Sequence, residues 1–381
     1  MKICFITTIH NTLQGFVLGF AEYLHQKTDW DITFICNYDE QFALSLPDYI
    51  HFIPVRMERG ISASGISAMR EMYQIFRREK FDLIQYSTPN ASCYAAIAGW
   101  LAKVPCRLYC QWGLAFEGFS GMKRRIFKSI EKMVCVLSTW IEPDSFGNLK
   151  YCRDLGFYSE NKSSVILSGS ACGVSLDKFD YKKKEQYRVE IREKYGISND
   201  TFVFGFVGSI TGDKGINELI AASREILETE QDVCVTLIGV KDKEESLDKD
   251  LLRWAESEKR FIFCGRSFYV EKNMSAMDCY VTASYREGFG MTVIEAGAMG
   301  LPVITSNIPG PTDAIIDGYN GLIVEKKNVE ALTAAMRWIC KNPYEARRIG
   351  MNGLENVRAK YDRKMVFEAM LEDRKRLMRN L

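Results

Sequence analysis

Two glutamates around a pair of glycines form the segment whose residue types carry the clearest chemistry. Glu287 and Glu295 stand eight residues apart, Gly288 and Gly290 lie between them, and a helical run follows. Glycines let a backbone approach a ligand closely, and amides at a helix start direct partial positive charge at an anion. The segment therefore predicts a phosphate cradle with a carboxylate near a sugar hydroxyl, although a solvated loop explains an isolated pair of glutamates equally well. The amides concerned belong to Met291, Thr292 and Val293.

A second glycine-rich turn follows an apolar run over 202–206. It contains Gly208, Gly212, Lys214 and Gly215. The turn is not a Walker A loop, because no Ser or Thr follows the lysine, and its spacing is not G-x-G-x-x-G. A strand, a glycine turn, a lysine and a helix in this order favour a diphosphate site with the lysine as a point charge. An ordinary turn with an exposed lysine is the alternative.

The elements that must position these motifs follow from hydrophobic patterning. Short β-branched and aromatic runs alternate with helical periodicity, which predicts parallel sheets with crossover helices. The pattern breaks between residues 161 and 184. We therefore predict an α/β fold of two doubly wound, Rossmann-like domains facing a cleft, over 1–170 and 171–360, and a helix over 361–381 that packs back on the first domain. Expected strands include 3–7, 31–36, 83–86, 202–207, 233–238, 261–263, 279–282 and 302–305.

Composition excludes several classes of function. The 381 residues exceed one ordinary core, and 47% hydrophobic residues argue against disorder. A net charge of +1 gives no field that would gather nucleic acid. No run is long enough for a signal peptide or a membrane span, so we expect a cytoplasmic protein whose twelve cysteines stay reduced. The three histidines have no metal-ligand spacing, so no metal or cofactor is expected.

Taken together, the motifs resemble the retaining glycosyltransferases of family 4, which have the two-domain GT-B fold, an E-x7-E motif and a Gly-turn-Lys-Gly loop. Residues 263–266, Phe-Cys-Gly-Arg, are similar to the strand-end motif of this family that contacts the base. Residues 317–322 resemble its D-G-x-N-G-L turn. The similarity covers most of the chain.

The resemblance implies that the protein transfers a sugar from a nucleotide-sugar, and UDP-sugars are the favoured donors. It also implies that the anomeric configuration is retained and that no metal is needed. Lys214 would hold the diphosphate, Glu287 the donor sugar and Glu295 the ribose. The sequence does not decide whether Glu287 is a nucleophile, and we assign it a positioning role first. The residues implied in donor binding are Gly208, Ser209, Lys214, Arg266, Glu287, Gly288, Phe289, Gly290, Met291, Thr292 and Glu295.

Two positions depart from the family pattern. Arginine commonly stands beside the turn glycine, but here the residue is Ser209, so charge neutralisation rests on Lys214 with help from Arg266. Trp112 occupies the place of a histidine near the donor sugar, and an indole cannot act as a base. Gln111 is expected to compensate by hydrogen bonding. A packed core aromatic explains Trp112 equally well.

Acceptor and membrane contacts are expected in the first domain. Its cleft candidates are Gly15, Gln111, Trp112, Phe116 and Glu117. Residues 121–133 separate an apolar face from a basic one, which favours docking on the inner leaflet over a solvated helix. The membrane candidates are Lys123, Arg124, Arg125, Lys128 and Lys132. The acceptor is expected to be a glycan or a polyprenyl-diphosphate-linked glycan of capsule, exopolysaccharide or lipopolysaccharide synthesis.

Two rival functions keep the same fold. A sugar-nucleotide epimerase would also bind a nucleoside diphosphate, but the scarcity of histidines and the paired glutamates favour transfer. A non-catalytic nucleotide-sugar or glycan-binding module is encouraged by Ser209 and Trp112. The intact Lys214, Glu287 and Glu295 argue against it.

Overall fold

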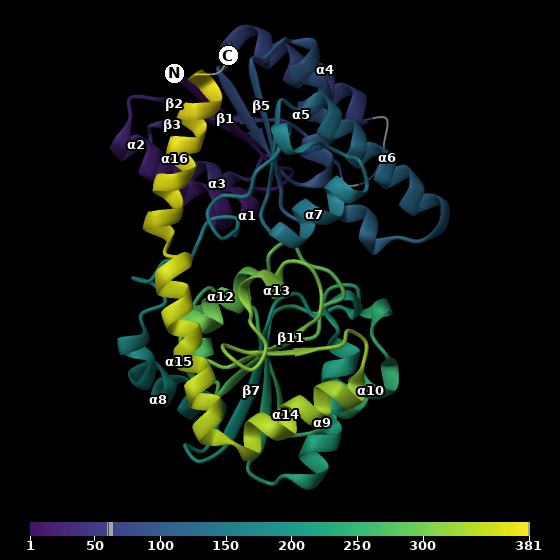
Figure 1. The fold of residues 1–381 in the computed structure, drawn as a ribbon, viewed down its shortest axis with the longest axis vertical. Coiled ribbons are helices and arrows are strands. Elements are labelled where there is room, and N and C mark those ends of the chain that lie inside the picture. Colours follow the sequence, from purple (N-terminus) through teal and green to yellow (C-terminus); the bar gives the residue numbers. More distant parts are fainter. Residues whose placement is uncertain (59, 61–63, 380–381) are drawn as a thin grey trace. The chain divides into compact units, whose positions relative to one another are not determined.

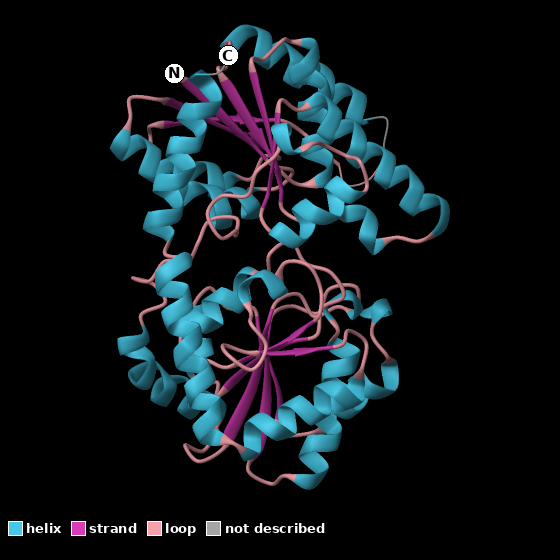
Figure 2. Ribbon diagram, viewed as in Figure 1, coloured by secondary structure: helices cyan, strands magenta, loops and turns pink. Residues whose placement is uncertain are grey.

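The computed structural model describes residues 1–58, 60 and 64–379, and the chain divides into two compact units (Figure 1). Unit 1 comprises Met1–Cys172 and Lys364–Leu381, and unit 2 comprises Gly173–Arg363. Each unit has a six-stranded sheet with helices on both faces (Figure 2). The predicted α/β fold of two doubly wound units is confirmed.

The sheet of unit 1 is parallel throughout, in the order β3-β2-β1-β4-β5-β6. This is the Rossmann order, which reverses direction between β1 and β4. The strands are β1 Lys2–Ile6, β2 Asp31–Cys36, β3 Ile50–Pro54, β4 Leu83–Tyr86, β5 Cys106–Gln111 and β6 Trp140–Pro143. The helices are α1 His10–Thr12, α2 Leu18–Lys27, α3 Glu40–Ser45, α4 Ser64–Glu79, α5 Pro89–Leu101, α6 Gly121–Leu137 and α7 Phe146–Asp154.

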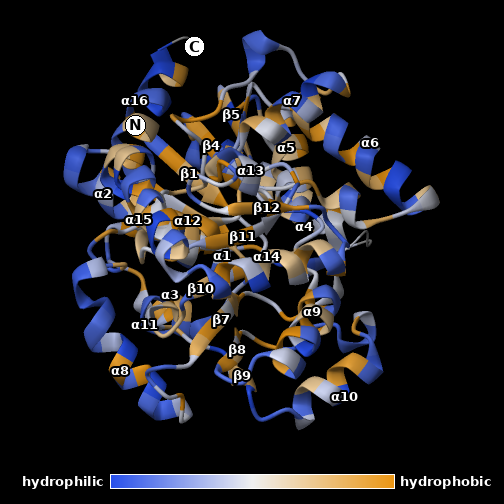
Figure 3. Cartoon of the chain, turned by 60° about the horizontal axis from the view of Figure 1, so that its bottom comes forward, coloured by the Kyte–Doolittle hydropathy of each residue, from blue (hydrophilic) through white to orange (hydrophobic). Residues whose placement is uncertain are grey.

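Unit 2 repeats the same topology, in the order β12-β11-β10-β7-β8-β9. Its central strands are buried on both faces, so they read as continuous apolar runs in the sequence (Figure 3). The strands are β7 Phe202–Val207, β8 Val233–Ile238, β9 Phe261–Gly265, β10 Cys279–Thr282, β11 Val303–Ser306 and β12 Leu322–Val324. The helices are α8 Lys184–Tyr195, α9 Ile216–Thr229, α10 Lys249–Ser257, α11 Val270–Ser275, α12 Met291–Ala298, α13 Pro311–Ala314, α14 Val329–Lys341 and α15 Pro343–Lys360.

The last helix, α16 Arg363–Arg379, returns the chain to unit 1. Phe367 packs its ring on Phe20 of α2, with ring centroids 5.4 Å apart. Arg374 is fully buried and donates to both carboxylate oxygens of Glu142 and, at 3.0 Å, to Gln85 Oε1. The helix is thus fixed to β4 and β6 by a buried ion pair as well as by apolar packing.

Candidate functional site

The two glycine-rich motifs lie at one edge of the unit 2 sheet. The first follows β7 and the second follows β10, and these strands pair in parallel. The carboxyl ends of parallel strands meet at the same edge, where open α/β sheets bind ligands. The loops after β8 and β11 complete this edge.

Backbone contact holds the turn after β7 close to the turn after β8. The Gly208 amide donates to the Ile238 carbonyl at 3.0 Å. A Cβ at Gly239 would lie only 1.8 Å from the Gly208 oxygen, so a side chain there would force the turns apart. Ser209, where the family commonly has arginine, is exposed at this turn.

Gly215 brings the end of the same turn against β10. It adopts a φ of +69°, and a Cβ there would lie 2.0 Å from the Ala283 oxygen. Both facts require glycine, because other residues disfavour a left-handed backbone and cannot fit. The turn that carries Lys214 therefore packs in direct contact with the loop that carries Glu287.

Lys214 and Glu287 form an ion pair that joins the two motifs. Lys214 Nζ donates to Glu287 Oε1 at 2.6 Å, and Ser284 Oγ donates to the same oxygen at 2.8 Å. The side chains of Lys214 and Glu287 are 29% and 18% exposed, so both remain accessible from solvent. The sequence predicted both residues at the site but did not predict that they pair.

A second ion pair braces these loops. Asp213 accepts from Arg286 Nη2 at 2.8 Å and from Thr211 Oγ1 at 2.6 Å. Burial alone would raise the pKa of Asp213, but the Thr211 hydrogen bond and the Arg286 charge hold it below its usual value. The Tyr285 amide also donates to the Asp213 carbonyl at 2.9 Å. Sequence reasoning did not identify Asp213 and Arg286, because surface charges in loops carry no distinctive pattern.

The glycines of the second motif open α12. Gly290 has a φ of +84°, and Gly288 lies so close to the next loop that a Cβ at Gly310 would be 2.2 Å from the Gly288 oxygen. Phe289 is a correction to the predicted donor-binding set, because its side chain is buried and packs on Tyr361 with ring centroids 5.4 Å apart. Only the backbone of Phe289 is left to face a ligand.

Fewer backbone amides are available to bind an anion at the start of α12 than the sequence predicted. The Val293 amide donates to the Gly290 carbonyl at 2.9 Å, so it does not belong to the cradle. The amides of Met291 and Thr292 remain at the helix start, where intrahelical acceptors are missing. The Thr292 hydroxyl accepts from the buried Tyr280 hydroxyl at 2.7 Å, which fixes this end of α12 to β10.

Glu295 lies half-buried on α12 among charged groups of unit 2. Burial raises the pKa of this carboxyl to about 7, and the charges of Lys178 and Arg363 oppose the shift while that of Glu271 adds to it. Lys178 Nζ lies 3.7 Å from Glu271 Oε2. A carboxyl with this pKa changes its charge near neutral pH and would accept hydrogen bonds best when ionised.

Arg266 follows β9 at the same edge of the sheet. Its side chain is exposed, and the guanidinium carbon lies 5.2 Å from the centre of the Phe268 ring. Among the described residues no hydrogen bond joins Arg266 to the Lys214 turn. Its role in charge neutralisation stays a prediction.

In unit 1 the structure brings two of the cleft candidates into one neighbourhood. Trp112 follows β5, and its ring lies 5.5 Å from that of Phe16, the neighbour of Gly15. Gly15 is exposed on a π-helical turn over Leu13–Val17, a conformation frequent at functional sites. Both segments stand at the carboxyl edge of the unit 1 sheet.

Two other cleft candidates require correction. Gln111 is fully buried, donates to Glu131 at 2.6 Å and accepts from Tyr158 at 2.9 Å. Phe116 is also fully buried. Neither side chain has surface with which to contact an acceptor. Glu117 is exposed, but it already accepts from Arg124 at 2.7 Å and from Tyr151 at 2.6 Å.

The basic helix predicted at 121–133 is α6. Its apolar face is divided, because Phe127 and Ile130 pack on the core whereas Met122 and Ile126 are 68% and 43% exposed. The exposed basic residues are Lys123, Arg125 and Lys132, while Arg124 and Lys128 are half-buried. Within the described ranges, no helix is long and apolar enough to cross a membrane. No group of three or more His, Cys, Asp or Glu side chains is placed to hold a metal in that same part of the chain.

Comparison with known proteins identifies the class and then the family. The model of group 1 glycosyl transferases matches residues 188–356, and the model of glycosyl transferase 4-like domains matches residues 2–141. The two matches place the two motifs and both sheets in a glycosyltransferase of the GT-B fold. The chain belongs to the family 4 glycosyltransferases, as the resemblance of its motifs predicted.

Individual relatives span nearly the whole chain. The capsular polysaccharide biosynthesis glycosyltransferase CapM of Staphylococcus aureus is 28% identical and covers 97% of this chain and 95% of its own. The Escherichia coli UDP-Gal:alpha-D-GlcNAc-diphosphoundecaprenol alpha-1,3-galactosyltransferase is 24% identical, with 81% and 79% covered. The crystal structure of Anabaena HepE in complex with UDP superposes with a TM-score of 0.80 at 18% identity, covering 98% and 100% of the two chains. This last similarity confirms the fold.

Proposed function

We propose that the chain transfers a sugar from a UDP-sugar to a polyprenyl-diphosphate-linked glycan during the synthesis of a cell-surface polysaccharide, with retention of anomeric configuration and without a metal ion. The observation that carries the proposal is the contact of Lys214 with Glu287 at the glycine-lined edge of unit 2. It joins a cation suited to a diphosphate with a carboxylate suited to sugar hydroxyls. The names of the E. coli and S. aureus relatives support the choice of donor and pathway.

The chemistry assigned to unit 2 is electrostatic. When the bond between sugar and diphosphate breaks, negative charge grows on the departing UDP. Lys214 and the amides of Met291 and Thr292 would stabilise that charge, because they are held in place before the reaction. Glu287 keeps the lysine oriented and would position the hydroxyls of the donor sugar. A carboxylate tied to Lys214 and Ser284 is better suited to positioning than to nucleophilic attack.

Lys214→Met tests this assignment, and Lys341→Met is its matched control. Lys341 forms an ion pair with Glu230 at 3.0 Å in the same unit, at the ends of α14 and α9. We expect Lys214→Met to slow UDP release from a UDP-sugar by about 100-fold, whereas the control keeps the wild-type rate. Thermal unfolding with UDP, GDP, ADP and CMP, with and without a chelator, identifies the base and tests for a metal.

The outcomes separate the proposal from its rivals. A wild-type protein that is stabilised by UDP but releases no UDP from any UDP-sugar would be a binding module, and the transferase assignment would fail. A change of sugar configuration in the nucleotide-bound product would indicate an epimerase. Equal rates in Lys214→Met and wild type would remove Lys214 from the reaction.

We further propose that α6 docks the protein on the inner leaflet. Met122 and Ile126 are exposed beside the cations Lys123, Arg125 and Lys132, as in interfacial helices. Cosedimentation with anionic vesicles at low salt should decrease several-fold in a triple Gln variant of these three cations. Binding to neutral vesicles, or anionic binding that the triple variant retains, would refute docking through α6.

A further inference from the structure

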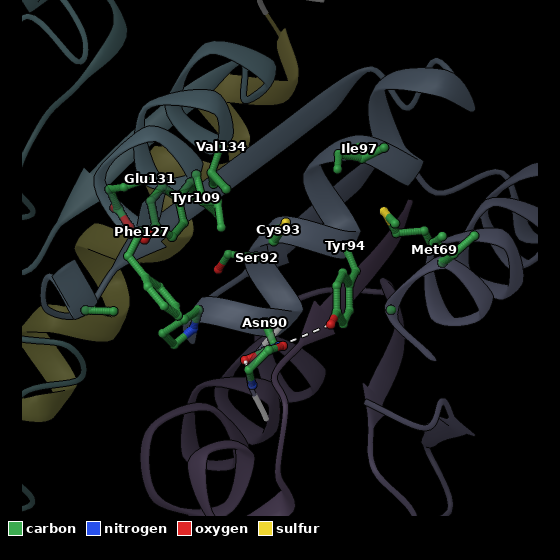
Figure 4. A pocket seen from close by; sticks show the side chains of 16 residues that line it. Met69, Asn90, Ser92, Cys93, Tyr94, Ile97, Tyr109, Phe127, Glu131 and Val134 are labelled. Carbon is green, nitrogen blue, oxygen red and sulfur yellow. Dashed lines mark hydrogen bonds between the residues drawn. The ribbon is translucent and has the colours of Figure 1, made fainter. Parts of the chain in front are cut away.

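Unit 1 contains a pocket of about 300 Å³ that the donor chemistry does not use (Figure 4). It lies between α4, α5 and α6, with Met69 on α4, Cys93 and Ile97 on α5, and Phe127 and Val134 on α6. The lining is mainly apolar, and the volume is at the lower end of the range for small-molecule sites. The first halves of α4 and α5 line it, so the pocket lies toward the carboxyl edge of the sheet, where these helices begin.

Polar groups gather at one part of the pocket. Ser92 is 1% exposed, and its hydroxyl points into the space between α5 and α6 (Figure 4). Among the residues that the structure describes, this hydroxyl has no hydrogen-bond partner. A buried hydroxyl without a partner is destabilising, so this atom favours an occupant that accepts a hydrogen bond. Ser92 lies in the first turn of α5, where the helix dipole favours negative charge.

Glu131 lines the same pocket from α6. Its Oε1 accepts from Tyr109 at 2.8 Å and from Gln111 at 2.6 Å. Burial raises the pKa of this carboxyl, although the two hydrogen bonds oppose the shift. Because burial disfavours the charged form of this carboxyl, Glu131 is compatible with an apolar neighbour in the pocket.

The surroundings of the pocket combine hydrocarbon with positive charge. Ile66, which lines the pocket from α4, is 69% exposed. Lys123 precedes Phe127 by one turn of α6, so both lie on the same side of that helix. An occupant with an apolar chain and an anionic head would complement the apolar lining, the Ser92 hydroxyl and the Lys123 cation at the same time.

We propose that this pocket binds the isoprenoid units nearest the diphosphate of the lipid-linked acceptor, with a phosphate oxygen accepting from the Ser92 hydroxyl. The inference rests on the proposed function, which requires a polyprenyl diphosphate, and adds the place where the lipid is held. Recognition of the lipid then depends on unit 1 alone. Donor binding depends on unit 2.

Binding of short diphosphates to the full chain, with UDP saturating the donor site, tests the pocket. The probes are farnesyl diphosphate, isopentenyl diphosphate and inorganic diphosphate. Wild type should bind farnesyl diphosphate at least tenfold more tightly than the other two. Cys93→Phe fills the pocket and should weaken the binding of farnesyl diphosphate at least tenfold. The control Cys340→Phe, at a half-buried cysteine of α14, should leave this affinity unchanged. Ser92→Ala should weaken the binding of farnesyl diphosphate several-fold.

Failure takes recognisable forms. The proposal would be overturned if affinity for the three diphosphates did not depend on the length of the isoprenoid chain. It would also be overturned if Cys93→Phe left the affinity for farnesyl diphosphate unchanged. Binding of N-acetylglucosamine that Cys93→Phe abolishes would overturn it in favour of a sugar site. If Cys93→Phe does not fold, Ile66→Asp at the exposed side of the pocket gives the same test. Thermal stabilisation by UDP is measured in the same samples. A protein that fails to bind UDP would refute the proposed function and not the pocket alone.

Discussion

Replacing Gly215 with alanine should separate the geometry of the donor site from the stability of the fold. The left-handed φ of +69° alone makes alanine less favourable by about 1–2 kcal/mol. The new Cβ would also lie 2.0 Å from the Ala283 oxygen, whereas carbon and oxygen ordinarily approach to about 3.3 Å. The turn must therefore move by about 1 Å, and Lys214 moves with it. A displacement of that size reduces catalysis by about 100-fold.

Gly196→Ala is the matched control for this prediction. Gly196 has nearly the same φ, +65°, and apart from its chain neighbours no described atom lies within 4 Å of its added Cβ. Both variants carry the backbone strain, and we expect each to lower the unfolding midpoint by a few degrees. Only Gly215→Ala should lose UDP-sugar hydrolysis, measured as UDP release under saturating donor. Hydrolysis in Gly215→Ala within threefold of Gly196→Ala would refute the claim that this backbone contact positions Lys214.

Two further predictions concern buried charge. Arg374→Met leaves Glu142 buried without its cation, so calorimetry should show that the free energy of unfolding falls by about 3–5 kcal/mol. Adding Glu142→Leu to this variant should restore most of the lost stability. A double variant that is no more stable than Arg374→Met would contradict the pairing. Burial raises the pKa of Glu295 from 4.5 to about 7, so its ionised form increases between pH 6 and 8. In the proposed donor site this ionised form would accept hydrogen bonds from the ribose hydroxyls. UDP affinity should rise over that range in wild type relative to Glu295→Gln, and parallel titrations of the two proteins would contradict this role. The native state holds this proton longer than the unfolded chain, so the same group lowers stability as pH rises from 4.5 to 7.

The sequence predicted the fold well because its strongest signals are local. Runs such as 202–207 and 233–238 are buried on both faces, and burial of that kind produces continuous apolar stretches that can be recognised without a structure. The motifs were recognisable for a similar reason. Gly215 and Gly290 adopt positive φ values, and such positions strongly favour glycine in any sequence with this geometry.

The contacts of the site could not be predicted in the same way. Lys214 and Glu287 are 73 residues apart, and their meeting depends on the pairing of β7 with β10. Gln111 was expected at a ligand because it precedes Trp112, which stands in place of the family histidine. A side chain at a strand end can turn inward, however, and here Gln111 meets Glu131. Arg374 is buried on a helix where hydrophobic patterning identifies only apolar positions, so its ion pair left no signal in the sequence.

The glycine contacts behind the donor site also define which positions can diversify. Gly215, Gly239 and Gly310 each have a neighbouring backbone oxygen within 2.2 Å of the position that a Cβ would take. A library designed to change donor preference should therefore keep these three residues fixed. Ser209 and Arg266 are exposed at the same edge, so new side chains at these two positions would not have to fit against a neighbouring backbone. Selectivity among related enzymes can then evolve on a backbone that scarcely changes.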